Sequence, residues 1–215
     1  MPYDTIIFDL DGTLLNTLDD LADSTNYALS QMGFPCRTID EVRQFVGNGV
    51  KLLIDRAVPT GTSEDKKEKC LSIFKEYYSK NMENKTRPYD GIIEMLSNLK
   101  KLNINIAVVS NKFDRAVKGL CEKYFSGYVN IAVGESEKIR KKPAPDSVLE
   151  VIKILGSSKE STLYVGDSDV DVITAHNAKI KCIGVTWGFR DKDLLQSCGA
   201  DYIIDKPCQI NDILK

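Results

Sequence analysis

The sequence of 215 residues has few of the features that would assign it to a special class of protein. No apolar run approaches the length of a membrane span, and the N-terminus has no charged region, long apolar stretch or cleavage site of a signal peptide. The six cysteines are far apart and form no C-x-x-C pair, so we expect reduced thiols that serve mostly as small core residues. We therefore expect a cytoplasmic protein that does not bind membranes. The cysteines are Cys36, Cys70, Cys121, Cys182, Cys198 and Cys208.

An excess of positive charge is also missing. The formal net charge is −2, and the lysines and arginines are spread along the chain without the basic stripe that nucleic acid requires. We expect no nucleic-acid partner, and a small anionic ligand would have to be held by local donors. Hydrophobic residues make up 42% and charged residues 28%, as in ordinary globular proteins.

Short apolar, β-branched runs recur along the chain and predict buried parallel strands, because several are continuous rather than alternating. They are Thr5–Phe8, Ile104–Val109, Val129–Val133, Thr162–Val165, Ile180–Val185 and Tyr202–Ile204. Helical patterns lie between them, such as Asp90–Lys101 and Pro145–Leu155, and Gly156 is a stop signal for the second. This alternation predicts an α/β fold, a doubly wound parallel sheet of the Rossmann-like type.

One interval interrupts the alternation with helical signals only. The predicted helices are Thr17–Met32, a short one opened by the capping box Thr38-x-x-Glu41, Val50–Val58, and one from Ser63 to about Met82. Some seventy residues of helix between two strands are too many for a simple crossover. We therefore expect residues 16–86 to form an inserted all-helical cap domain and residues 1–15 and 87–215 to form the catalytic core.

Three polar clusters follow predicted strands, at the sheet edge where open α/β folds bind ligands. They are Asp9-Leu10-Asp11-Gly12-Thr13, Ser110-Asn111-Lys112 and the stretch from Gly166-Asp167 to Asp171. Each cluster also has a structural explanation without function. The first could be a capped turn, the second an ordinary strand end, and the third a helix cap followed by an acid in the first turn. Taken together, the clusters support one another as parts of a single site.

Two carboxylates on one turn, with further carboxylates opposite, suit phosphate chemistry. Mg²⁺ binds carboxylate oxygens together with substrate phosphate and water. A carboxylate that attacks phosphate meets like charge, and each pair of unit charges at 4 Å repels by about 4 kcal/mol at an effective dielectric of 20. A metal and a lysine offset this repulsion. A carboxylate nucleophile divides hydrolysis into two steps, and a second Asp can act as acid and then as base.

The chain resembles the haloacid dehalogenase superfamily over essentially its whole length, and within it the phosphatases with a helical cap. The resemblance implies that Asp9 is the nucleophile and Asp11 the acid/base, with the backbone carbonyl of Asp11 also binding the metal. Thr13 belongs to the same motif, and the resemblance implies that it binds the substrate phosphate. Ser110 matches the residue whose hydroxyl binds the transferring phosphoryl group, and Asn111, beside it, is expected to bind the phosphate as well.

The third and fourth motifs of this superfamily have matches as well. Lys142, immediately before Pro143, matches the motif lysine, although a basic run is normally a solvated face and Lys141 is the alternative. Asp167 matches the metal-binding acid, and Asp171 its supporting acid. The resemblance thus implies a Mg²⁺ site formed by Asp9, Asp11 and Asp167.

Closer similarity points to a subgroup, the phosphoglycolate phosphatases. It rests on Gly47-Asn48-Gly49-Val50, on Val109-Ser110-Asn111-Lys112 and on Gly184-Val185-Thr186-Trp187-Gly188. In the cap, Gly49 could approach a ligand closely and Arg56 could pair with a substrate carboxylate; the alternatives are a helix-breaking turn and an exposed helix charge. Asn16-Thr17 and Lys179 depart from the subgroup, where relatives often have Asp-Ser and Gly.

Several other functions share parts of this pattern. A sugar phosphomutase of the β-phosphoglucomutase type, a pyrophosphatase or a nucleotidase has the same motifs, and only product and substrate assays separate them. Dehalogenases lack the second Asp, so Asp11 argues against them. A signalling receiver domain is shorter and has no cap. The single histidine, His176, is predicted to be exposed on the helix after Asp167, which argues against phosphohistidine chemistry. Neither a monomer nor a homodimer is favoured.

Overall fold

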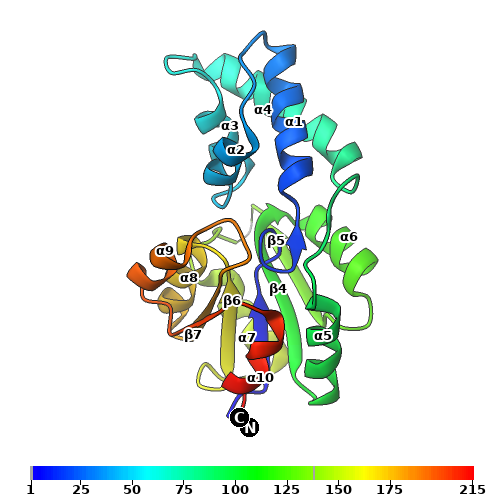
Figure 1. Ribbon diagram of the computed structural model, residues 1–215, viewed down its shortest axis with the longest axis vertical. Helices are drawn as coiled ribbons and strands as arrows, with labels where there is room; N and C mark the ends of the chain where they lie inside the picture. Colours follow the sequence, from blue (N-terminus) through cyan, green and yellow to red (C-terminus); the bar gives the residue numbers. More distant parts are fainter. Residues whose placement is uncertain (1, 138) are drawn as a thin grey trace. The chain divides into compact units, whose positions relative to one another are not determined.

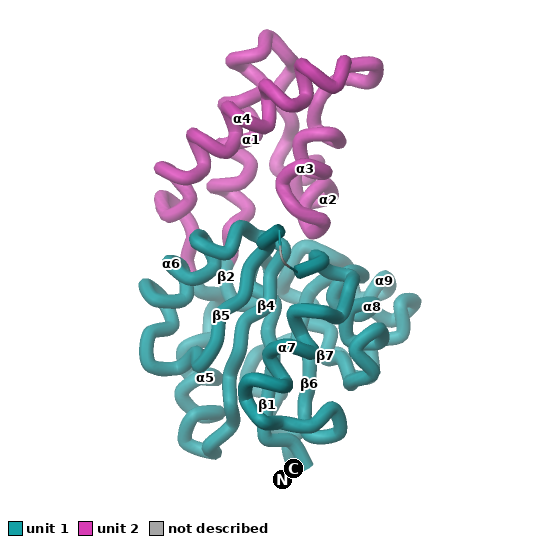
Figure 2. The backbone as a smooth tube through the Cα atoms, turned by 180° about the vertical axis from the view of Figure 1, so that it is seen from behind, with its two compact units in different colours: residues 1–15, 88–215 teal, residues 16–87 magenta. Residues whose placement is uncertain are grey.

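The computed structural model describes residues 2–137 and 139–215, and it divides the chain into two compact units. Unit 1 comprises the chain up to Leu15 together with Pro88–Lys215, and unit 2 is Asn16–Arg87 (Figure 2). The boundary expected from the sequence, between residues 86 and 87, differs from this one by a single residue. Unit 2 therefore interrupts unit 1 in the sequence, soon after its first strand.

Unit 1 contains a six-stranded sheet in the order β5-β4-β1-β6-β7-β8, and every neighbouring pair is parallel. The strands are β1 (Thr5–Phe8), β4 (Asn105–Phe113), β5 (Ile131–Glu135), β6 (Thr162–Gly166), β7 (Lys181–Val185) and β8 (Tyr202–Ile204). In register, Ile6 lies between Ile106 of β4 and Leu163 of β6. The predicted doubly wound parallel sheet is confirmed.

Helices cover both faces of this sheet (Figure 1). On one face lie α5 (Ile92–Lys101), α6 (Asp114–Phe125) and α10 (Ile210–Ile213), and on the other lie α7 (Asp146–Leu155), α8 (Asp169–Ala178) and α9 (Lys192–Ser197). A short 3-10 helix, η1 (Pro207–Gln209), precedes α10. Ile6 and Phe8 of β1 pack toward the first group and Ile7 toward the second, so both faces of the strand are buried.

Two strands differ from their predicted bounds by more than one residue. The apolar run in β4 ends at Val109, but the strand continues to Phe113, which pairs with Glu135. The polar residues in between are buried, so hydrophobicity alone could not predict this extension. β5 begins two residues later than predicted. Asn130, just before it, still bonds to the neighbouring strand: its N–H donates to the Ile106 carbonyl at 2.7 Å, and its side-chain oxygen accepts from the Ile106 N–H at 2.8 Å.

Unit 2 consists mainly of four helices, α1 (Leu18–Gln31), α2 (Ile39–Phe45), α3 (Val50–Ala57) and α4 (Glu64–Asn81). α2 begins with the predicted capping box, in which Thr38 and Glu41 bond to each other's backbone N–H groups. α1 packs against α4, where the rings of Tyr27 and Tyr77 stack with centroids 3.9 Å apart.

The two segments of chain that connect the units pair with each other. β2 (Leu15–Asn16) and β3 (Arg87–Pro88) form a two-stranded sheet, which the sequence pattern did not predict because each strand has only two residues. All six cysteines are free thiols. None of the helices in the described part of the chain combines the length and apolar composition needed to cross a bilayer.

Candidate active site

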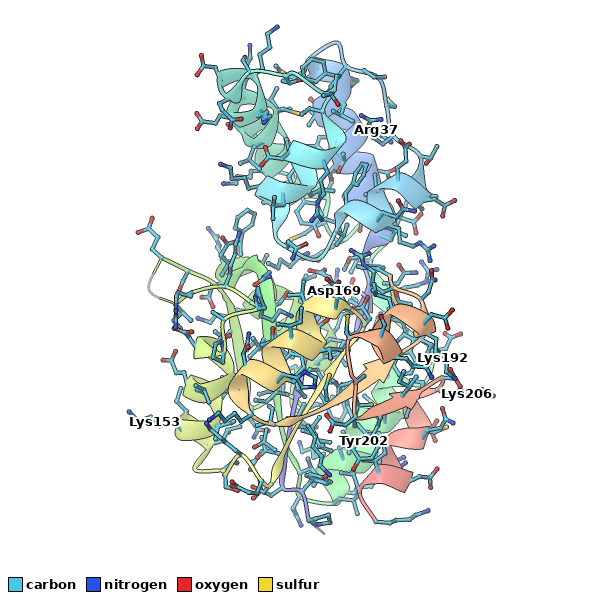
Figure 3. The ribbon with its side chains drawn as sticks, turned by 90° about the vertical axis from the view of Figure 1, so that its left-hand side faces the viewer. Arg37, Lys153, Asp169, Lys192, Tyr202 and Lys206 are labelled. Atoms are coloured by element: carbon cyan, nitrogen blue, oxygen red, sulfur yellow. The ribbon has the colours of Figure 1, made fainter. Side chains whose placement is uncertain are left out.

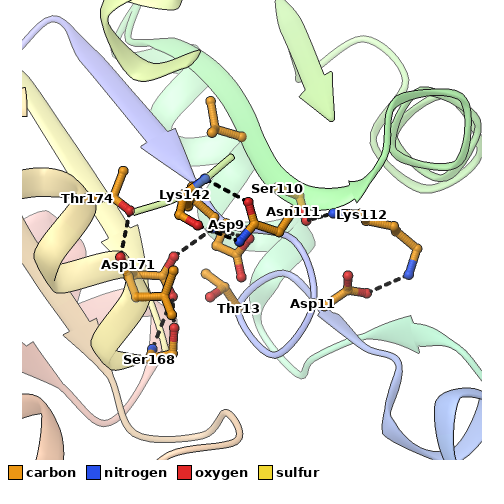
Figure 4. A network of polar contacts seen from close by, with 12 residues as sticks. Asp9, Asp11, Thr13, Ser110, Asn111, Lys112, Lys142, Ser168, Asp171 and Thr174 are labelled. Atoms are coloured by element: carbon orange, nitrogen blue, oxygen red, sulfur yellow. Dashed lines mark hydrogen bonds and ion pairs between the residues drawn. The ribbon is translucent and has the colours of Figure 1, made fainter. Parts of the chain in front are cut away.

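The candidate site is built from residues at the carboxyl ends of β1, β4 and β6 and from the segment between β5 and α7 (Figure 4). β1 ends at Phe8, and the Asp9 N–H still donates to the Val165 carbonyl at 2.8 Å, so Asp9 lies at the rim of the sheet. The turn that follows is closed by backbone bonds from Leu14 and Leu15 to the Leu10 carbonyl. These bonds hold both acids of the first motif on one short, fixed loop.

Lys142 joins residues from three parts of the chain. Its Nζ donates to Asp9 Oδ1 and to Asp171 Oδ1, both at 2.7 Å, and to the Tyr164 hydroxyl at 3.0 Å. The side chain is buried, which is tolerated because two carboxylates lie against the ammonium group. Burial by itself would lower the pKa of Lys142, but Asp171 and Asp9 outweigh it and raise that pKa well above its ordinary value.

Lys141, by contrast, is exposed. The structure therefore brings Lys142, and not its neighbour, to the carboxylates of the site.

Asp171 is fully buried, and both of its carboxylate oxygens accept hydrogen bonds. Oδ1 accepts from Lys142 and from the Tyr164 hydroxyl at 3.2 Å, and Oδ2 accepts from the Ser168 N–H at 3.1 Å and the Ser168 Oγ at 2.6 Å. Ser168 and Asp171 form the capping box that begins α8. This arrangement ties the start of the helix to the lysine, so Asp171 supports the site through its neighbours.

Asp167 is held on both oxygens as well. Thr13 Oγ1 donates to Oδ1 at 3.1 Å, and the backbone N–H of Phe189 donates to Oδ2 at 2.7 Å. Burial, followed by the charge of Asp171, raises the pKa of Asp167 to about 7 against the opposing effect of these donors. Burial and the charge of Asp171 therefore outweigh the two donors and the positive charge of Lys142 at this carboxyl group.

Asp9, Asp167 and Asp171 each offer an oxygen, and these atoms all lie within 4.8 Å of one another. Burial raises the pKa of Asp9 well above its ordinary value; Asp171 and Asp167 add to this, while Lys142 opposes it. If all are ionised, three negative charges face the one positive charge of Lys142. Three buried hard oxygen donors with two uncompensated charges fit a divalent cation, so this group could hold a metal ion.

Asn111 contacts the main chain of the third motif. Its Nδ2 donates to the Lys142 carbonyl at 3.0 Å, and its Oδ1 accepts from the Lys142 N–H at 2.8 Å. Lys142 precedes Pro143 through a cis peptide bond. The side chain expected beside the phosphate thus fixes the backbone of the lysine.

Ser110 and Asp11 lie on the other side of the network. Ser110 is buried near the end of β4, and its Oγ accepts from the Lys112 N–H at 3.3 Å. Asp11 lies outside the three-carboxylate cluster, and its Oδ1 is 2.9 Å from Lys112 Nζ (Figure 4). Of the expected acids, the structure therefore groups Asp9, Asp167 and Asp171 and separates Asp11 from them.

Close approach of the backbone to Asp167 requires glycine at two positions. A Cβ atom on Gly12, whose φ is 88°, would lie 2.3 Å from Asp167 Oδ2, and one on Gly188 would lie 2.3 Å from Asp167 Cβ. A side chain at either position would displace this carboxylate. Gly12 belongs to the first motif, whereas Gly188 follows β7, outside all four motifs.

Several functional residues have no signal in the motifs. Tyr164 lies in an apolar strand, and Phe189 contributes a backbone N–H, which no residue type reveals. Trp187 packs against the core, as expected, and its Nε1 also donates to the Thr13 carbonyl at 3.0 Å. Lys112 belongs to the second polar cluster and to a subgroup motif, but neither pattern predicts its contact with Asp11. His176 is exposed on α8.

Gly49 and Arg56 belong to unit 2. Gly49 has a φ of 86° and precedes α3, so the backbone there favours glycine. The guanidinium of Arg56 donates to the Phe45 carbonyl at 2.8 Å and to Asn48 Oδ1 at 3.1 Å. Arg56 therefore braces the end of α2 and the loop that follows it within unit 2.

Comparison with known proteins gives consistent relatives. The phosphoglycolate phosphatase 1 of Pseudomonas aeruginosa is 34% identical over 190 residues, which cover 86% of this chain and 70% of that protein. The phosphoglycolate phosphatase of Aquifex aeolicus is 32% identical over 207 residues, covering 95% of this chain and 93% of the relative.

Solved structures match over the full length. One from Lactobacillus delbrueckii subsp. bulgaricus has a TM-score of 0.94 with 35% identity, covering 100% of this chain and 99% of that one. A predicted phosphoglycolate phosphatase from Haemophilus somnus has a TM-score of 0.93 with 30% identity and the same coverage. The haloacid dehalogenase-like hydrolase family matches residues 6–185. The chain belongs to this family of hydrolases.

Proposed function

We propose that the chain is a Mg²⁺-dependent phosphatase that hydrolyses a small phosphomonoester through a transient aspartyl phosphate on Asp9. The observation that carries this proposal is the contact between Asp9 and Lys142 within a buried group of carboxylates at the carboxyl edge of the sheet. A nucleophilic carboxylate beside a fixed ammonium group and a cluster of hard oxygen donors is the arrangement that phosphoryl transfer to Asp requires.

Each residue has a separate role in this proposal. A carboxylate oxygen of Asp9 bonds to phosphorus while the bond to the leaving oxygen breaks, and Asp11 gives that oxygen a proton. Asp11 then takes a proton from water as the water oxygen bonds to phosphorus and the Asp9–phosphorus bond breaks. Lys142 neutralises charge beside Asp9, Ser110 binds the transferring group, and Asn111 and Asp171 position Lys142.

Asp9 and Asp167 would hold Mg²⁺, together with the backbone carbonyl of Asp11, and Thr13 and Asp171 would support them. When bound, the cation supplies positive charge that lowers repulsion between the carboxylates and a phosphate. The fit of the donor set rests on the buried oxygens within 4.8 Å of one another.

Six free thiols are consistent with a cytoplasmic location.

The proposed substrate is a small anionic ester such as 2-phosphoglycolate. Relatives that bear the name phosphoglycolate phosphatase, at 32% and 34% identity, support this choice. The core residues address only the phosphate and the metal, so discrimination falls to unit 2, as a cap domain. Arg56→Ala and Gly49→Val should therefore reduce hydrolysis of the preferred substrate more than hydrolysis of a generic aryl phosphate.

The decisive experiment measures release of inorganic phosphate from phosphoglycolate, hexose phosphates, nucleotides, pyrophosphate and an aryl phosphate, with Mg²⁺ and with a chelator. We expect metal-dependent release and the highest kcat/KM for phosphoglycolate. Asp9→Asn should abolish turnover without changing the melting temperature by more than a few degrees. Residual activity within tenfold of wild type would exclude Asp9 as the nucleophile, and isomerised sugar phosphate as the product would indicate a mutase.

A further inference from the structure

Lys112 is a buried lysine outside the roles assigned above. Its side chain is 3% exposed, and its Nζ lies 2.9 Å from Asp11 Oδ1, a carboxylate that is 15% exposed. The two residues are 101 positions apart: Lys112 lies near the end of β4, and Asp11 lies in the loop after β1. A buried ammonium group is costly unless an opposite charge compensates it, so this ion pair is part of the folded core.

The local backbone directs Lys112 toward Asp11. The register between β4 and β5 shifts between Val109 and Phe113, and such an irregularity changes the direction of the side chains within it. Gly134 of β5 lies so close that a Cβ there would be 2.6 Å from the Lys112 carbonyl oxygen. The segment is therefore packed tightly on the side of its neighbouring strand.

The Asp11 side of the pair is also fixed. The backbone of Asp11 forms an isolated β-bridge with Leu15, inside the loop that is closed by hydrogen bonds to the Leu10 carbonyl. Figure 4 shows the Asp11 carboxylate directed toward Lys112, apart from the residues around Lys142. One lysine thus serves the proposed nucleophile, and a second lysine serves the proposed acid/base.

We propose that Lys112 is a positioning residue for Asp11, which holds the acid/base carboxylate in the orientation needed for proton transfer. This inference rests on the proposed phosphatase function. In the first step the proton leaves Asp11 for the leaving oxygen, and in the second it returns to Asp11 from water. Lys112 Nζ donates to Asp11 Oδ1, so the other carboxylate oxygen carries the transferred proton. The ammonium group thus holds the Asp11 side chain in place during both transfers without exchanging a proton itself.

A positioning role predicts dependence on the leaving group. An alkyl phosphate needs a proton on its departing oxygen, whereas a dinitrophenyl phosphate leaves well without one. The parameter to compare is kcat/KM, because it reports the steps up to formation of the phosphoenzyme and excludes its hydrolysis. Lys112→Met keeps the apolar stem of the side chain and removes its charge.

We expect Lys112→Met to lower kcat/KM for the alkyl phosphate by tenfold or more and for the dinitrophenyl phosphate by less than threefold. Lys112→Arg should restore much of the loss. The matched control is Lys118→Met, which removes an exposed lysine that lies 2.6 Å from the Asp114 carboxylate on α6 and should change neither value. Equal losses for both esters, or no loss for either, would overturn the proposal.

A double variant tests whether Lys112 acts through Asp11. With Asp11→Asn already present, Lys112→Met should add less than a twofold loss, since no acid remains to be positioned. A further tenfold loss would overturn the proposal, and Lys112→Gln, which also removes the charge, is used in the same cycle if Lys112→Met does not fold. If the wild-type chain hydrolyses neither ester, the proposed function fails and this inference with it; normal hydrolysis with an unaffected Lys112→Met variant removes only the inference.

Discussion

The two units bury charge in different ways. In unit 1, Asp9, Asp167 and Asp171 are buried close to one another, with the side chain of Lys142 among them. Among the described residues of unit 2, Asp20 is the buried charged side chain, and its carboxylate accepts from the backbone N–H groups of Lys85 and Thr86 at 2.8–3.0 Å.

This difference separates a chemical role from a structural one. Backbone N–H groups fix a carboxylate and satisfy it, so Asp20 has no unmet demand for positive charge. Carboxylates buried against each other are not neutralised in this way, so they favour the binding of a metal cation or another positive group. The nature of the partner, rather than burial alone, therefore identifies a candidate site.

The largest expected effect is the loss of Lys142. Lys142→Ala should lower kcat by about 10³-fold or more, because it removes the charge beside the proposed nucleophile and leaves two buried carboxylates without their shared ammonium group. The control is Lys141→Ala, which should stay within threefold of wild type. Steady-state assays with an aryl phosphate check both, and equal losses in the two variants would break the contrast.

Metal binding by unit 1 comes next. Mg²⁺ should raise the melting temperature of the wild-type protein, since a ligand that binds only the folded state stabilises it. Asp167→Asn should need at least tenfold more Mg²⁺ for the same rise and the same activity, because one anionic oxygen donor is lost. A thermal shift titration measures this, and an unchanged titration would place the metal elsewhere.

The metal-free protein should also depend on pH. The pKa of Asp167 is raised from 3.8 to about 7, chiefly by burial, so the folded chain keeps this proton where the unfolded chain has lost it. The free energy of unfolding should therefore fall as the pH rises from about 4 to about 7, and Asp167→Asn should remove part of that slope. Denaturant titrations across this range provide the test, and a stability that instead rises would contradict the assignment.

A medium effect, on stability alone, is expected in unit 2. Asp20→Ala should lower the free energy of unfolding by about 1–3 kcal/mol, because two backbone N–H groups lose their acceptor. Asp23→Ala, which removes an exposed ion pair with Lys85, should cost no more than about 0.5 kcal/mol. For both variants kcat with an aryl phosphate should stay within threefold of wild type. A larger kcat loss in Asp20→Ala would contradict a purely structural role for Asp20.

The smallest effect concerns left-handed backbone. In unit 2 the described residues with positive φ are glycines, whereas in unit 1 Lys179, at the end of α8, has a φ of 60°. Lys179→Gly should raise the free energy of unfolding by up to about 1 kcal/mol, because glycine adopts this conformation without strain. Lys153→Gly, at an exposed position within α7 (Figure 3), should lower it by about 1 kcal/mol. Thermal melts of the two variants test whether stability rises in the first and falls in the second.

Much of unit 1 could be predicted from sequence, because the relevant signals are local. Continuous apolar runs predicted the strands, and the polar clusters after them predicted that Asp9 and Asp167 lie at one edge of the sheet. The roles of Lys142 and Asp171 were expected only from the family resemblance. Gly156 ends α7 in the left-handed conformation, as its residue type suggested. These features depend on short stretches of chain and on the rule that ligands bind where parallel strands end.

The remaining features depend on contacts that no local pattern encodes. The pairing of Lys112 with Asp11 follows from an irregular register between two strands, and the bond from Phe189 to Asp167 uses a backbone N–H. Asn111 matched a phosphate-binding position, yet both ends of its amide contact the Lys142 backbone. Arg56 could pair with a substrate by its charge alone, but its bonds within unit 2 were not foreseeable.

The central place of β1 in the sheet has a consequence for how the chain folds during synthesis. Thr5 pairs with Asn105 and Thr162, which follow it by 100 and 157 positions. The helices of unit 2 emerge from the ribosome as one contiguous stretch and can associate early. Both edges of the apolar strand Thr5–Phe8 stay unpaired until its two neighbouring strands have been synthesised. The interval before residue 166 is synthesised is therefore the period in which the nascent chain is most exposed to aggregation and most in need of a chaperone.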